Sequence, residues 1–191
     1  RRGDNIALCG GNCSNWAGAF FAVITYGAVA VPILHEFKSE QVLNILNHSE
    51  SKLLFVGEKV WKELSSADLK IEVSDFKGIV SLIDFSIIRS NNKGLTNAID
   101  HINLLFGQRH PKAFTPADVD YVKTYGDELL IINYTSGSTG MSKGVMIPQR
   151  AVWNNVQFFI DYLSPRLNTR GSIVSILPMA HMYGMAFELL S

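Results

Sequence analysis

Hydroxyl residues and glycines are concentrated in one short segment in the second half of the sequence. Residues 135–140 contain four hydroxyl residues and two glycines, and Lys143 follows three positions after Gly140. Glycine lets backbone N–H groups come close to an anion, hydroxyls donate further hydrogen bonds, and a lysine adds a mobile positive charge. This combination predicts a loop that binds phosphate groups, so we expect a protein that handles a nucleotide.

The loop lies between two apolar segments, which distinguishes it from the commonest phosphate-binding motifs. Residues 129–133 predict a buried strand before the loop, and residues 145–147, ended by Pro148, predict a second buried strand after it. The motif G-x-x-x-x-G-K-[ST] does not fit because Lys143 follows Ser142, and no G-x-G lies at a strand-to-helix turn here. Without a following helix, the loop donors and Lys143 must hold the phosphate charge themselves.

The segment from Tyr134 to Val145 resembles the signature of the adenylate-forming, or AMP-binding, superfamily. This superfamily includes acyl-CoA synthetases, the adenylation domains of peptide synthetases and luciferases. Its members commonly have threonine where Ser138 stands and proline where Ser142 stands. Residues 15–32, 45–56 and 177–184 resemble other family segments, whereas residues 58–125 match only loosely. A chance linker rich in serine, threonine and glycine is the alternative, and the flanking strands and the lysine position argue against it.

The resemblance implies a reaction in two steps. A carboxylate attacks the α-phosphate of ATP to give an acyl-adenylate and pyrophosphate, and the thiol of coenzyme A or of a carrier protein then displaces AMP. Hydrogen-bond donors and Mg²⁺, bound through the ATP phosphates, would stabilise the leaving pyrophosphate. Lys143 would neutralise the outer phosphates, with a solvated surface lysine as the alternative. The phosphate cradle would consist of Thr135, Ser136, Gly137, Ser138, Thr139 and Gly140.

A second group of candidate residues follows an expected strand at residues 172–177. His181 would lie at the carboxyl edge of the sheet, where α/β proteins keep their sites, and the resemblance places it beside the carboxylate substrate. The alternative is a histidine at the start of a helix that bonds only to the local backbone. Met182, Tyr183 and Gly184 would line an acyl pocket, with Gly184 leaving room for a chain, or they belong to the core.

Apolar spacing predicts alternating strands and helices over most of the chain. We expect strands at residues 6–9, 28–32, 53–56 and 78–83. We expect a helix that is capped by Ser14 or Asn15 and ended by Gly27 in a left-handed conformation, a second helix that is capped by Ser39 and runs through about Asn47, and a third over residues 149–163. Residues 91–94 predict a turn. The pattern favours an α/β fold with a mainly parallel, layered sheet flanked by helices.

We divide the chain into a first α/β portion at residues 1–85, a connector region at 86–127, and a portion with the phosphate loop and acyl site at 128–191. Together they are expected to form part of an N-terminal AMP-binding domain. The chain begins at Arg1 without methionine and ends within an apolar run, so we expect a longer protein. The C-terminal lid of the family, with its adenylation lysine, is not found, and residues 1–191 alone are expected to be inactive.

Composition excludes several classes of function. The chain has 191 residues and 47% hydrophobic residues, enough for a substantial core, and its 17 basic residues balance 17 acidic ones, which gives no support for a nucleic-acid partner. No apolar run is long enough for a transmembrane segment. Two cysteines, Cys9 and Cys13, are too few for a zinc site and predict a reducing, cytoplasmic setting. The remaining histidines lack metal-ligand spacing: His35, His48, His101 and His110.

The sequence therefore predicts ATP-dependent activation of a carboxylic acid, in particular a fatty or other acyl acid, followed by thioester formation with coenzyme A. Residues 171–181 resemble acyl-CoA synthetases more than amino-acid-activating domains. Three alternatives stay open: a nucleotide-sensing module without catalysis, an adenylation domain that activates an amino or aryl acid for a carrier protein, and an acyl-binding scaffold.

Overall fold

The computed structural model describes residues 1–67, 69–119, 121–123, 126–135, 142–163, 165 and 176–190. Its described strands form one seven-stranded sheet in the order β5-β4-β3-β1-β2-β6-β7. Strands β4, β3, β1, β2 and β6 run parallel, and β5 and β7 add antiparallel edges. The strand bounds are β1 Asn5–Cys9, β2 Val29–Ile33, β3 Leu53–Val56, β4 Gly78–Ser81, β5 Ile87–Ser90, β6 Leu129–Thr135 and β7 Lys143–Pro148. The predicted α/β fold with a mainly parallel sheet is confirmed.

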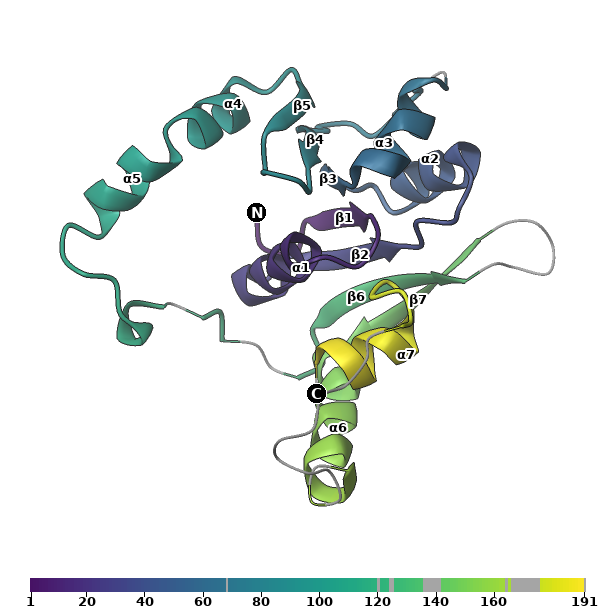
Figure 1. Cartoon of the computed structure of the whole chain (residues 1–191), viewed down its shortest axis with the longest axis vertical. Coiled ribbons are helices and arrows are strands. Elements are labelled where there is room, and N and C mark those ends of the chain that lie inside the picture. The colour runs from purple at the N-terminus through teal and green to yellow at the C-terminus, as the bar shows by residue number, and fades with distance from the viewer. Residues whose placement is uncertain are drawn as a thin grey trace.

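Helices cover both faces of this sheet (Figure 1). Their bounds are α1 Ser14–Tyr26, α2 Ser39–His48, α3 Glu58–Ser65, α4 Lys93–Asp100, α5 Ile102–Arg109, α6 Gln149–Phe158 and α7 Met182–Gly184. A 3₁₀ turn spans Pro116–Asp118, and π-helical turns at Phe159–Leu163 and Met185–Leu189 extend α6 and α7. The predicted helix at residues 149–163 is thus confirmed, with a wider final turn.

The pleat of the strands divides the core into two apolar clusters. In β1, Ala7 and Cys9 belong to the cluster that packs on α2 and α3, whereas Leu8 belongs to the cluster that packs on α1. Successive side chains of a strand point to opposite faces, so one short strand supplies both layers. Trp16 and Phe20 of α1 are fully buried and stacked, with ring centroids 5.5 Å apart.

The helices on the two faces differ in their outer surfaces. Helices α2 and α3 carry acidic and basic residues on their outer sides, whereas α1, with the sequence SNWAGAFFAVITY, contains no charged residue. One flank of α1, at Gly18, Ala19 and Ala22, borders an open apolar hollow of about 830 Å³. Strands β3 and β4 form its floor, and α4 and α5 supply its far wall through Leu95, Ile99 and Ile102.

The predicted caps of two helices are wrong, because each observed cap lies at an earlier residue. Cys13 precedes α1 with extended backbone, and its Sγ accepts a hydrogen bond from the Trp16 N–H at 3.4 Å, so neither Ser14 nor Asn15 is the cap. Lys38 occupies the cap position of α2, because Ser39 already has helical backbone. Gly27 ends α1 with φ of 86°, a left-handed conformation that glycine adopts without strain, as predicted.

The region expected to be a connector contains a strand and two helices, β5, α4 and α5. The predicted turn at residues 91–94 is the start of α4 instead: Asn92 Oδ1 accepts a hydrogen bond from the Leu95 N–H at 2.9 Å. Asparagine suits both turns and helix caps, which explains the error. Helix α3 was also missed, although Val60 and Leu64 are buried at helical spacing.

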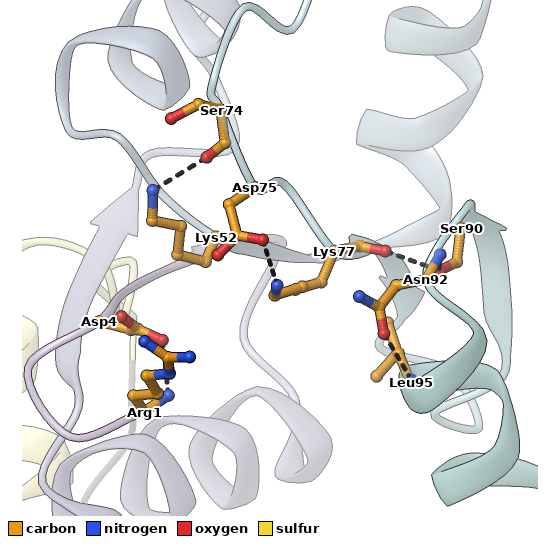
Figure 2. Close-up of polar contacts among 9 residues, drawn as sticks. All are labelled: Arg1, Asp4, Lys52, Ser74, Asp75, Lys77, Ser90, Asn92 and Leu95. Atoms are coloured by element: carbon orange, nitrogen blue, oxygen red, sulfur yellow. Dashed lines mark hydrogen bonds and ion pairs between the residues drawn. The ribbon is translucent and has the colours of Figure 1, made fainter.

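A chain of hydrogen bonds ties α4 to the sheet (Figure 2). The Lys77 N–H donates to the Lys52 carbonyl at 2.7 Å, and Ser90 Oγ donates to the Lys77 carbonyl at 2.6 Å. The Asn92 N–H then donates to Ser90 Oγ at 2.9 Å, one bond before the cap on Leu95. These contacts fix the far wall of the apolar hollow relative to β3 and β4.

The two cysteines should differ sharply in thiol reactivity. Cys9 is fully buried in β1, and burial raises the pKa of its thiol to about 12, whereas Cys13 is exposed. Because the thiolate is the reactive form, Cys13 should react with Ellman's reagent at pH 8 and Cys9 only after denaturation. Mass spectrometry of labelled peptides checks this, with Cys13→Ser as the control. Rapid labelling of Cys9 in folded protein would contradict the described core.

Candidate functional site

The expected phosphate loop is framed by a β-hairpin. Strands β6 and β7 pair antiparallel, and Thr135 at the end of β6 lies opposite Lys143 at the start of β7. This confirms a strand on each side of the loop. Among the predicted cradle residues, Ser136, Gly137, Ser138, Thr139 and Gly140 lie outside the described residues.

The two hairpin strands differ in burial. Strand β6 lies between β2 and β7, and its side chains at Ile131 and Asn133 are buried, as predicted, as is that of Tyr134. Strand β7 is the sheet edge, and Val145 and Met146 are 49% and 68% exposed. The expectation that β7 is buried is therefore wrong, because a strand with a neighbour on only one side leaves its side chains open.

Lys143 and Thr135 are both exposed at the loop end of the hairpin. Within the part of the chain that the structure describes, no ion pair involves the Lys143 ammonium. A hydroxyl and an ammonium on adjacent strands suit phosphate oxygens better than a metal ion. No group of three or more histidine, cysteine, aspartate or glutamate residues comes together among the described residues.

The Tyr134 ring packs across the hairpin at the residue pair next to the loop end. It lies opposite Gly144, where an added Cβ would stand 3.1 Å from Tyr134 Cζ and 3.0 Å from Ile132 Cγ2. Gly144 therefore leaves the space that the ring occupies. The Tyr134 hydroxyl lies 2.7 Å from His48 Nδ1, and burial raises the pKa of this hydroxyl above its ordinary value. His48 thus has a polar partner, but nothing in the sequence linked it to Tyr134.

The segment that carries His181 is held by two asparagine side chains. Asn12, in the loop after β1, donates from Nδ2 to the Leu177 carbonyl at 2.8 Å and accepts from the Met179 N–H at 2.7 Å. Asn133 of β6 donates from Nδ2 to the Ala180 carbonyl at 3.1 Å in a buried setting. Strand β6 therefore connects the two groups of candidate residues. Sequence reasoning missed both asparagines, although Asn133 is a polar residue in an apolar strand.

His181 precedes α7, and its Nδ1 accepts a hydrogen bond from the Tyr183 N–H at 3.2 Å. This is the local backbone contact named above as the alternative. The side chain is nevertheless exposed, and with Nδ1 accepting, a neutral imidazole carries its proton on Nε2. The local bond therefore leaves an Nε2–H donor for a ligand. The expected strand at residues 172–177 lies mostly outside the described residues.

The residues expected to line an acyl pocket differ in their surroundings. Tyr183 is 57% exposed, and Met182 is half-buried against the α1 cluster. At Gly184 an added Cβ would lie 2.7 Å from the Pro178 carbonyl oxygen, so the glycine permits close backbone contact. Its expected role of leaving room for an acyl chain stays a prediction.

Among the helices that the structure describes, none has the length and apolar character that a membrane-spanning helix needs.

Comparison with known proteins gives a consistent result. The profile of the family described as AMP-binding enzyme matches residues 1–191. Acyl-CoA ligase SID4 of Ajellomyces capsulatus is 26% identical over 197 residues, which cover 100% of this chain and 32% of that protein. Long chain acyl-CoA synthetase 2 of Arabidopsis thaliana is 28% identical over 191 residues, which cover 98% of this chain and 28% of that protein.

The fold matches a solved structure as well. The inhibitor-bound N-terminal domain of FACL13 from Mycobacterium tuberculosis superposes with a TM-score of 0.71 at 23% identity, covering 99% of this chain and 42% of that chain. The present chain thus spans about a third of the length of the curated relatives named above.

The close contact at Gly184 can be tested by adding one methyl group. Gly184→Ala should lower the free energy of unfolding by about 1–3 kcal/mol, because the Pro178 backbone must move and disturb the turn with His181. Gly107→Ala in α5 is the matched control, since its Cβ would meet nothing within 4 Å. Urea unfolding of the purified variants measures both, and equal effects at the two positions would contradict the packing of α7.

Proposed function

Because the chain belongs to the AMP-binding enzyme family, we propose that the whole protein activates a carboxylic acid with ATP and transfers the acyl group to coenzyme A. The observation that carries this proposal is the hairpin that places Thr135 opposite Lys143 at the two ends of the hydroxyl- and glycine-rich loop. The bond from Asn133 to the Ala180 carbonyl connects that hairpin to the turn before His181.

The substrate class rests on the relatives. Both relatives named above are acyl-CoA ligases or synthetases, and one is a long-chain enzyme. A fatty or other acyl acid is therefore our proposed substrate, and coenzyme A is the proposed thiol acceptor. The free cysteines suit a reducing compartment, and a cytoplasmic location is part of the same proposal.

Charge repulsion is the obstacle that this site must overcome, because an anionic carboxylate approaches an anionic triphosphate. Lys143 would place its ammonium beside the outer phosphates, and the Thr135 hydroxyl with the loop N–H groups would donate to phosphate oxygens. These contacts strengthen as charge develops on the leaving pyrophosphate. Mg²⁺, held through the ATP phosphates, would add further neutralisation.

His181 would act on the acid. Its Nε2–H can donate to one oxygen of the carboxylate while Nδ1 remains bonded to the Tyr183 N–H. The local bond fixes the ring, so the capping role and the substrate role are compatible. Met182, Tyr183 and Gly184 follow directly and would contact the acyl chain.

Removing the Lys143 ammonium should slow the first step. Lys143→Ala in the full-length protein is expected to reduce acid-dependent ATP–pyrophosphate exchange about tenfold to a hundredfold. Lys59→Ala is the matched control, since Lys59 is exposed on α3 on the other side of the sheet. An unchanged exchange rate for Lys143→Ala would remove this lysine from the mechanism. Absence of acid-dependent exchange in the unmodified protein would favour a nucleotide sensor or a scaffold.

Asparagine at position 181 separates the two roles of the histidine. Asparagine is a preferred helix cap, so His181→Asn should preserve the start of α7 and the stability of the protein. It lacks the Nε2–H donor, so exchange should fall about tenfold to a hundredfold, as expected for a lost hydrogen bond to a charged group. Thermal unfolding is the folding control. Full activity of His181→Asn together with reduced activity of His181→Ala would show that capping is the whole role.

A further inference from the structure

We propose that His48 is a positioning residue for Thr135 and Lys143, because its hydrogen bond to Tyr134 fixes the end of the strand from which the proposed phosphate loop begins. The inference rests on the proposed function, since it assigns the loop to ATP. His48 lies at the end of α2, 86 positions before Tyr134 in the sequence, so the bond joins two separate layers of the fold.

The described backbone pairing between the hairpin and the rest of the sheet is short, so a side-chain contact at the outer part of the hairpin adds support there. Strand β2 pairs with β6 at Ala30 and Ile131, and the described ladder between these two strands includes no pair beyond that point. From Ile132 to Thr135, β6 is paired only with the exposed edge strand β7 in the described sheet. The side chains of Asn133 and Tyr134 add hydrogen bonds between this part of β6 and the rest of the protein, beside the apolar packing of Ile132.

Tyr134 lies where it can fix the position of the two residues that flank the loop. It immediately precedes Thr135, and its ring fills the space left by Gly144, the residue directly after Lys143. One side chain therefore contacts both strands at the rung next to the loop. The His48 and Tyr134 rings meet edge to face with centroids 5.7 Å apart, so the contact fixes the ring as well as the hydroxyl.

His48 in turn stands on a fixed support. Val42, Ile45 and Leu46 anchor α2 in the core with at most 1% exposure. Just after His48, the Ser49 carbonyl accepts a hydrogen bond from Asn5 Nδ2 of β1 at 2.6 Å. The end of α2 is thus tied to a central strand, and the bond to Tyr134 extends this support to the hairpin.

The hydrogen bond between His48 and Tyr134 can be removed by substitution at position 48 without changing the packing of the core. His48 is exposed and borders an open hollow of about 270 Å³ together with Tyr134 and Gly144. Truncation at position 48 therefore leaves a space that water can enter. We expect His48 variants to fold, and changes in nucleotide binding to report on the position of the hairpin.

The test uses the full-length protein with ATP and a fatty acid. His48→Ala and Tyr134→Phe should each raise the KM and Kd for ATP about tenfold, the effect of one lost hydrogen bond, while the KM for the acid and kcat stay within about twofold. The double variant His48→Ala/Tyr134→Phe should lose no more than either single variant, because both remove the same interaction. His48→Asn should recover most of the affinity, since its amide can occupy the position of Nδ1.

His101→Ala is the matched control, because His101 is exposed and its Nδ1 contacts only the local Asn97 carbonyl. Additive losses in the double variant, unchanged ATP affinity, or an equal rise in the KM for the acid would overturn the role of His48. Wild-type protein that binds ATP in calorimetry without acid-dependent exchange would overturn the proposed reaction instead, and the Kd comparison would still decide the role of His48. Wild-type protein that does not bind ATP would overturn both.

Discussion

The alternation of side chains along β6 is the constraint on which the candidate site depends. Ile131 and Asn133 face the layer of α1 and α7, and Ile132 and Tyr134 face the layer of α2 and α3. Successive residues of one strand therefore reach both sides of the sheet. Asn133 holds the turn before His181, Tyr134 meets the end of α2, and the strand then ends where the proposed phosphate loop begins. A shift of this strand by one residue would exchange the two sets and separate the candidate residues.

The site combines exposed functional groups with buried supports. Thr135, Lys143 and His181 are exposed, whereas the side chains of Asn133 and Tyr134 that hold their backbone are buried and hydrogen-bonded. Buried polar groups are costly unless they find partners, so these bonds favour one arrangement of the hairpin and the turn. The proposed chemistry of the exposed residues therefore depends on the buried hydrogen bonds of Asn133 and Tyr134.

Local patterns predicted much of this arrangement. The apolar runs located β1, β3 and β6, the hydroxyl- and glycine-rich run located the loop, and Gly27 marked the end of α1. The bonds from Tyr134 to His48 and from Asn133 to Ala180 join residues 86 and 47 positions apart, and periodicity in a single sequence contains no information on such pairs. The edge position of β7 was also missed, because apolar residues alone do not tell a central strand from an outer one. Its exposure follows from the order of the strands.

The uncharged composition of α1 has a practical consequence. Residues such as Phe21 and Ala22 on its outer side meet water beside the hollow that α4 and α5 border, and no lysine or glutamate of the helix is available to keep molecules apart. In a sample of residues 1–191 we expect this apolar surface to promote self-association. Protein concentration and detergent thus become variables that measurements on residues 1–191 have to control.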